Sequence, residues 1–194
     1  MFQDILISGL VNSGVYALLA LGFSLIFGVA RIVNIAHTAF YMLASYALYG
    51  MLVVGGVPLL LAIPLAVAAV VALSLLCYKL VIEPVRQHES AVLIATIALA
   101  LIFQESLLVS FGGHFLGIPN AVEGVVSIIG VRVSYQRVIV LAVVAITLVA
   151  TWYLLNHTRL GLAIRAAAND QEIANLMGIN VGRVAMYTVG ISVA

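Results

Sequence analysis

Long hydrophobic runs separated by short polar breaks dominate this sequence. Crossing roughly 30 Å of hydrocarbon takes about 20 apolar residues, and five of the runs approach or exceed that length. A sixth run begins near Val184 and reaches Ala194. The pattern predicts an all-α fold, a polytopic helical membrane protein with five full transmembrane spans, the start of a sixth, and a single transmembrane domain over residues 1–194. The predicted spans are residues 5–30, 38–54, 57–82, 91–111, 138–155 and 184–194.

Residues 158–182 interrupt these runs with the pattern of a short amphipathic helix between two spans. Asn169 is predicted to cap the helix, Glu172 follows three residues later, and Gly178 is predicted to end it. The apolar positions of this helix share one face, because they are spaced at i, i+3 and i+4: Ile173, Leu176 and Met177. A compact apolar surface just outside a membrane is suited to binding a second protein whose movement is passed on to this one.

Composition supports a membrane protein and narrows the function. The chain is 65% hydrophobic and 8% charged, whereas soluble domains are about one quarter charged. Its net charge of +1 argues against nucleic-acid binding. The single cysteine, Cys77, cannot form an internal disulfide or a site of several thiolates, and the histidines are not placed to share a metal or haem. We therefore expect no catalytic, metal or haem site.

The sequence also lacks an ATP-binding loop. The only lysine, Lys79, follows Tyr78, so a Walker A motif cannot occur. If ATP drives this protein, we expect a partner chain to bind it.

Basic residues predict the orientation of the spans, because cytoplasmic connections carry an excess of Lys and Arg. With residues 158–182 in the cytoplasm and the N-terminus outside, two arginines fall in the connection 112–137, which becomes extracytoplasmic. The other basic residues lie inside or at the inner edge: Arg31, Lys79, Arg86, Arg159, Arg165 and Arg183. Within the outer connection, residues 131–135 alternate like a short strand.

Polar residues within the spans mark candidates for a translocation path. Between Arg31 and Tyr41 the chain reads RIVNIAHTAFY. Asn34 and His37 there belong either to an ordinary cytoplasmic turn or to a broken helix whose backbone dipoles line a polar path. Glu105, inside the fourth span, is either a pathway or coupling acid or a satisfied structural group.

Small residues recur every four positions in the first span. Ala20, Ser24 and Gly28 have the spacing that lets helices approach closely in lipid. We expect this row to pack tightly in the helix bundle, and it is also compatible with lining a translocation path.

Together these features resemble the permease subunits of branched-chain amino-acid ABC importers, the LivH type. The resemblance covers the whole chain, and its distinctive motifs are GLVNSGVYALLALGFSLIFGVARIVNIAHTAFYMLASY and TRLGLAIRAAANDQEIANLMGINVGRVAMYTVGISVA. Glu172-Ile173-Ala174 followed by Gly178 is similar to the motif by which such permeases dock on their ATPase. The resemblance implies that the apolar helix face enters a groove on the ATPase, that Arg165 and Glu172 set the polar register, and that Gly178 permits the exit.

The resemblance implies a permease for branched-chain or other small apolar amino acids in the bacterial cytoplasmic (inner) membrane. Its expected partners are cytoplasmic ABC ATPase subunits, a second homologous permease subunit, an extracytoplasmic solute-binding protein and membrane lipid, with no cofactor in this chain. Family chains continue through further spans, so we expect a fragment or truncated product. The alternatives are a urea or short-amide permease of the same family, an ion-coupled secondary transporter using Glu105, and an assembly fragment that docks partners without transport.

Overall fold

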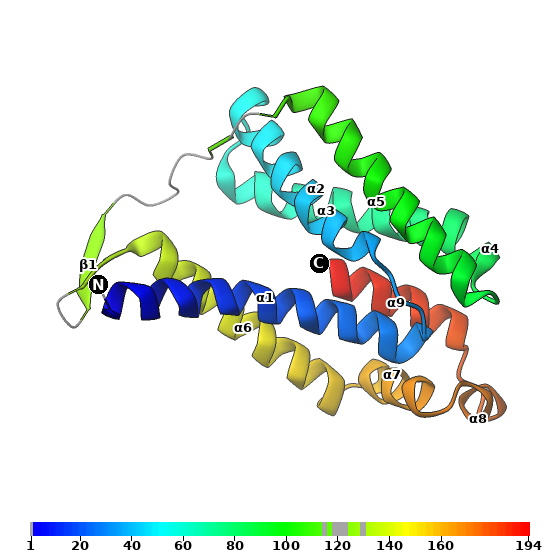
Figure 1. Cartoon of the computed structure of the whole chain (residues 1–194). Coiled ribbons are helices and arrows are strands. Elements are labelled where there is room, and N and C mark those ends of the chain that lie inside the picture. Colours follow the sequence, from blue (N-terminus) through cyan, green and yellow to red (C-terminus); the bar gives the residue numbers. More distant parts are fainter. Residues whose placement is uncertain (1, 114–115, 118–123, 129–130) are drawn as a thin grey trace. The chain divides into compact units, whose positions relative to one another are not determined.

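The computed structural model describes residues 2–113, 116–117, 124–128 and 131–194, and this part of the chain is almost entirely helical (Figure 1). Five helical stretches there are long and apolar enough to cross a membrane: Ser8–Ala30, Ala36–Val54, Leu59–Val85, Glu89–Phe111 and Tyr135–His157. Val181–Val193 is a shorter apolar helix. The prediction of an all-α polytopic membrane protein is confirmed, because each long hydrophobic run forms a helix that satisfies its own backbone groups.

The helices follow the predicted runs, with bounds that differ by a few residues. α2 (Ala36–Tyr49) and α3 (Leu59–Cys77) each continue as a π-helical turn, η1 (Gly50–Val54) and η2 (Tyr78–Ile82). The remaining elements are α1 (Phe2–Ala30), α4 (Glu83–Val85), α5 (Glu89–Phe111), β1 (Val125–Ile128), β2 (Val131–Ser134), α6 (Tyr135–His157), α7 (Arg159–Asn169), α8 (Gln171–Leu176) and α9 (Val181–Val193).

The chain forms two compact units, one of residues Met1–Leu21 and Pro119–Leu162, the other of Gly22–Ile118 and Ala163–Ala194. In the first unit, β1 and β2 pair antiparallel, with Val125 opposite Ser134, which confirms the strand predicted near residues 131–135. Arg137 at the start of α6 donates a 2.8 Å hydrogen bond to the Ser8 hydroxyl of α1.

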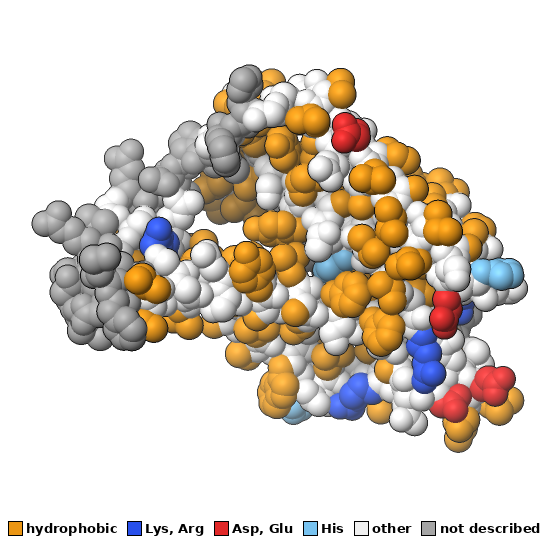
Figure 2. Space-filling view, in the orientation of Figure 1, with side chains coloured by type: hydrophobic (Ala, Val, Ile, Leu, Met, Phe, Trp, Pro, Cys, Tyr) orange, Lys and Arg blue, Asp and Glu red, His pale blue; other side chains and the backbone are white. Residues whose placement is uncertain are grey.

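The second unit is a helical bundle in which α2 packs against α3 and α5, and α3 packs against α9. The rings of Phe40 on α2 and Phe103 on α5 lie 5.5 Å apart at the centre of this packing. Its buried core contains Ala36, Phe40, Val70, Cys77 and Leu99. Figure 2 shows hydrophobic side chains over the outside of these helices, as expected where lipid is the solvent.

The first span packs closely through residues other than the predicted row. Ser24 is exposed, and a Cβ atom at Gly28 would meet nothing within 4 Å in the described part of the chain. In the second unit, α1 instead buries Gly22, Ile26 and Val29, which are spaced at i, i+4 and i+7. Tight packing of Ala20, Ser24 and Gly28 therefore stays a prediction for the assembled protein.

Candidate functional site: the coupling loop and the polar break

The polar segment after α6 begins with a tight corner in the first unit. The Thr158 hydroxyl donates to the Leu154 carbonyl at 2.6 Å and accepts from the Gly161 amide at 3.0 Å. It thus satisfies one group at the end of α6 and one at the start of α7. The corner turns the chain directly from α6 into α7.

The short amphipathic helix predicted in this segment is α8, and Asp170 caps it. The Asp170 carboxylate accepts from the amides of Glu172 at 2.8 Å and Ile173 at 3.0 Å. The prediction that Asn169 caps this helix is wrong. Asn169 is the last residue of α7, and the extended backbone of Asp170 separates the two helices. Asp and Asn are about equally good caps, and here the carboxylate one residue later accepts the free amides of the first turn.

The end of α8 is formed by Gly178, as predicted. Gly178 has a φ of +83°, a conformation that glycine adopts without the cost of a Cβ atom. Its amide donates to the Asn175 carbonyl, and the Ile179 amide donates to the Ala174 carbonyl, both at 3.0 Å. This pattern closes the helix and turns the chain toward α9.

The predicted apolar face of α8 is exposed. Ile173 and Leu176 on α8 and Met177 directly after it are 55%, 86% and 79% exposed, whereas Ala174 is buried at 2%. α8 rests on α9. Three large apolar side chains therefore project from a helix whose other face is anchored.

Not every residue predicted for the coupling helix lies on it. Glu172 and Ala174 are on α8, but Arg165 and Asn169 are on α7. Arg165 lies on the exposed side of α7, which is strongly amphipathic and buries Ile164 and Ala167. The loop is thus a pair of helices rather than the single short helix predicted.

The polar break between α1 and α2 comprises Arg31–Ile35, which is not helical. Arg31 has a φ of 53°, unusual for a residue other than glycine. α2 begins at Ala36 after Ile35, without a side-chain cap. Neither Asn34 nor Thr38 therefore caps α2.

The break returns into the depth of the first span. A Cβ atom at Gly22 would lie 2.7 Å from Nε2 of His37, so His37 is beside Gly22. Gly22 precedes the end of α1 by eight residues, which is about 12 Å along a helix. The start of α2 thus lies beside the middle of α1, and the broken helix remains a prediction.

Asn34 in the break and His37 at the start of α2 are unusual because they are polar and buried. Asn34 is 2% exposed and His37 is 4% exposed. The Asn34 side-chain oxygen has no hydrogen-bond partner among the described residues. Since buried polar atoms are nearly always paired, this oxygen is suited to accept from something that the single chain does not hold.

Glu105 lies in a different environment from the other two predicted path residues. It is exposed on α5, whereas Asn34 and His37 are buried. The structure does not bring the three together in one site. An exposed carboxylate within a span is costly against lipid, which favours a covered or polar environment for Glu105 in the assembled protein.

Two long-range hydrogen-bonding side chains join the polar segment 158–182, called the coupling loop below, to the end of α1 and to the first residue of the polar break. Arg31 Nη2 donates to the carbonyls of Ala168 at 3.4 Å and Asn169 at 3.1 Å. Gln171 Nε2 donates to the Val29 carbonyl at 2.8 Å. Sequence reasoning missed the roles of Asp170, Gln171 and Arg31; for Asp170 the signal was present, since Asp is as good a cap as Asn.

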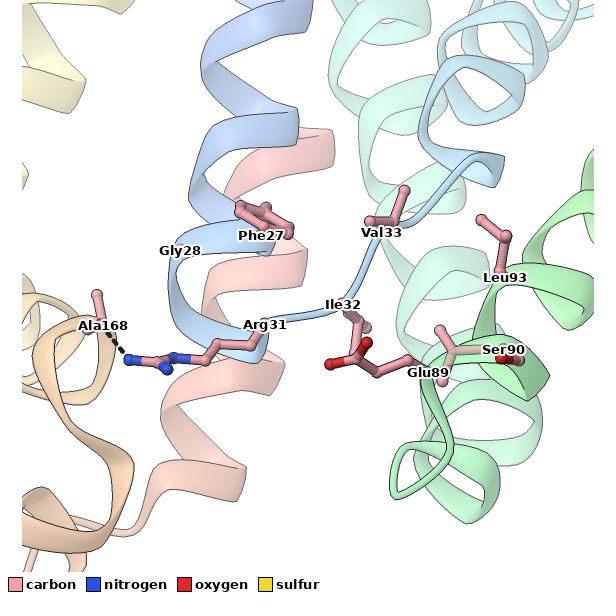
Figure 3. A pocket seen from close by; sticks show the side chains of 10 residues that line it. Phe27, Gly28, Arg31, Ile32, Val33, Glu89, Ser90, Leu93 and Ala168 are labelled. Carbon is pink, nitrogen blue, oxygen red and sulfur yellow. Dashed lines mark hydrogen bonds between the residues drawn. The ribbon is translucent and has the colours of Figure 1, made fainter.

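A pocket of about 660 Å³ opens beside Arg31 (Figure 3). Figure 3 shows Arg31 reaching toward Ala168 on one side, while Glu89, the first residue of α5, extends toward Ile32. Apolar side chains line the rest of the pocket, among them Phe27, Val33 and Leu93. Among the described residues, no group of three His, Cys, Asp or Glu side chains could hold a metal ion.

Known proteins similar to this chain are membrane permeases. Residues 5–194 match the family described as branched-chain amino acid transport system / permease component. BraD of Pseudomonas aeruginosa, a high-affinity branched-chain amino acid transport system permease protein, is 29% identical over 97% of this chain and 66% of its own length. LivH of Escherichia coli K12, with the same description, is 25% identical over 100% of this chain and 67% of its own length.

A probable branched-chain amino acid transport permease protein, LivH of Methanocaldococcus jannaschii, is 26% identical over 95% of this chain and 60% of its own length. The chain thus spans about two thirds of the length of these relatives. No solved structure matches it significantly. A multi-pass protein of the cytoplasmic (inner) membrane follows from the family and from the long apolar helices. Because the family match covers nearly every residue, the chain belongs to the branched-chain amino acid transport system permease component family.

Proposed function

We propose that this chain is a permease subunit of an ATP-binding-cassette importer for branched-chain (hydrophobic) amino acids. It contributes part of the translocation path and docks through α8 onto a cytoplasmic ATPase, which binds and hydrolyses the ATP. The names of BraD and LivH, both branched-chain amino acid permease proteins, support this substrate class. A second related permease subunit and an extracytoplasmic solute-binding protein complete the proposed importer.

The observation that carries the proposal is the exposed apolar face of α8. Leu176 and Met177 are 86% and 79% exposed and lie between the candidate span Tyr135–His157 and α9, in the segment proposed to be cytoplasmic. Burying such side chains in a groove of a soluble partner is favourable, at about 1.5–3 kcal/mol for each fully buried large apolar side chain. A helix in a groove is a common way to do this.

The anchoring of α8 suits it to transmit force. Asp170 fixes its start, Gly178 fixes its end, and α8 packs against α9 with Ala174 buried. Closure of the ATPases on ATP displaces a helix held in this way as a unit. The bundle then alternates between outward and inward access, with Asn34 and His37 along the path.

The test is a cysteine crosslink from Met177→Cys in a Cys77→Ser background, in native membranes with and without ATP. The expected result is an adduct with a cytoplasmic ATPase subunit whose yield changes with ATP. Val54→Cys is the matched control, because Val54 is 77% exposed but is the last residue of η1, which is expected to face outside. If Met177→Cys is inserted and gives no ATPase adduct, α8 is not the docking helix.

Substituting Glu105→Gln distinguishes the importer from an ion-coupled transporter. In the importer, uptake by the Glu105→Gln variant is lost on ATP depletion and persists when the proton and sodium gradients are collapsed. If the substitution itself abolishes gradient-driven uptake, Glu105 is a coupling acid and the importer proposal is wrong.

A further inference from the structure

Two helix ends in the second unit cap one another. The last carbonyls of an α-helix have no partner within the helix, and here each end receives a side chain from the other segment. Gln171 at the start of α8 donates to Val29 in the last turn of α1, at 2.8 Å. Arg31, just after α1, donates to Ala168 and Asn169 in the last turn of α7, at 3.4 and 3.1 Å.

The positive charge of Arg31 favours its hydrogen bonds to the last carbonyls of α7. The C-terminal end of a helix carries partial negative charge, and a cation there is stabilising. The second donor, Gln171, is neutral and faces a single carbonyl. The two links are therefore chemically distinct, and each can be removed without removing the other.

The positions of Gln171 and Arg31 in the chain connect the start of α8 to the polar break. Gln171 is the first residue of α8, directly after the capping Asp170. Arg31 is the first residue of the polar break and precedes the buried Asn34 by three residues. A displacement of α8 thus reaches the break through Gln171 and the end of α1, and through α7 and Arg31.

We infer that Arg31 and Gln171 form the link through which movement of the docking helix α8 shifts the polar break Arg31–Ile35. This inference rests on the proposed function, since it assumes that an ATPase moves α8. Both are positioning residues: they hold the break in register with α8 and contact neither ATP nor the transported molecule.

The break is a suitable element for such control. Arg31 holds a φ of 53°, and the Asn34 side-chain oxygen is buried without a partner among the residues that the structure describes. A segment in this condition gains a partner for that oxygen when it moves. When the Asn34 side-chain oxygen gains or loses a partner, the polarity of the proposed translocation path beside His37 changes.

The test uses the assembled importer, with this chain, its partner permease, its ATPases and its binding protein, in proteoliposomes. Variants Gln171→Ala and Arg31→Ala each remove one link, and the double variant removes both. Three quantities are measured: ATPase that co-purifies with the permease, the rate of ATP hydrolysis, and radiolabelled leucine taken up per ATP hydrolysed.

We expect each variant to retain the ATPase and its hydrolysis while uptake per ATP falls about tenfold, the order of effect of losing the one hydrogen bond of Gln171 or the two of Arg31. The double variant is expected to lose less than the product of the two single losses, because both links act on the same break. Arg159→Ala is the matched control. It removes an exposed arginine from the other end of α7 and leaves uptake per ATP unchanged.

Each other outcome is decisive. Unchanged uptake per ATP in Gln171→Ala and Arg31→Ala overturns the link, and so does loss of the ATPase from the purified complex, since the residues would then act in docking. If a variant fails to accumulate in the membrane, Gln171→Glu and Arg31→Met replace it. The first keeps the shape but cannot donate, and the second keeps a long unbranched side chain but has no N–H donor.

The proposed function fails separately. In that case no ATPase co-purifies with the unmodified chain, and Leu176→Ala changes nothing. The inference that Arg31 and Gln171 transmit movement from α8 to the break then fails as well, because it rests on the proposed function.

Discussion

Gly22 is the residue at which the first span and the polar break depend most directly on one another. A Cβ atom there would lie 2.6 Å from the Ser192 carbonyl and 2.7 Å from His37 Nε2. Both distances are too short for a carbon atom, and the carbonyl belongs to the backbone. Any side chain at Gly22 must therefore displace either α9 or the start of α2.

Replacing Gly22 with alanine tests this contact. We expect Gly22→Ala to lower stability by about 1–3 kcal/mol, the usual cost of overpacking, and to reduce transport through displacement of His37. Gly28→Ala on the same helix is the control, because its Cβ would meet nothing within 4 Å in the described residues. Thermal unfolding in detergent measures both, and equal unfolding temperatures would contradict the close contact.

Asp170 and Asn169 allow the capping assignment to be tested directly. Asp170→Ala removes the acceptor for two amides of α8 and is expected to cost about 0.5–2 kcal/mol in local stability. Asn169→Ala leaves the carbonyl that binds Arg31 and is expected to have little effect. Amide hydrogen exchange across α8 reads out the difference, and greater exchange in Asn169→Ala would favour the original prediction.

Elements differ in how far the sequence could predict them. The long helices follow from hydrophobicity alone, because a run of apolar residues in lipid has no better conformation than a helix. The strand β2 was visible from its alternation. The end of α8 was visible as well, because Gly178 meets a local backbone requirement.

The division of the coupling loop into α7 and α8 was harder to predict. It depends on which of two adjacent polar residues caps α8, a choice between near-equal local energies. The links that hold the loop are not local at all: Gln171 and Val29 are 142 positions apart. The depth of the polar break likewise depends on the contact of His37 with Gly22, which no periodicity encodes.

At the scale of the whole molecule, the remaining sequence prediction is the orientation. The connection Gly55–Pro58, between η1 and α3, and the tip of α8 are predicted to lie on opposite sides of the membrane. Both sites have exposed residues: Val54 is 77% exposed and Met177 is 79% exposed. Because the two side chains are similarly exposed, a difference in labelling between cysteines at the two positions reports on which side of the membrane each position lies.

Cysteine labelling in intact cells decides the orientation. In a Cys77→Ser background, a membrane-impermeant maleimide is expected to label Val54→Cys before the cells are opened and Met177→Cys only afterwards. The physical reason is the distribution of basic residues, with six of the eight on the side of α8. The reverse labelling would place α8 outside the cell, away from ATP, and docking on a cytoplasmic ATPase would then be impossible.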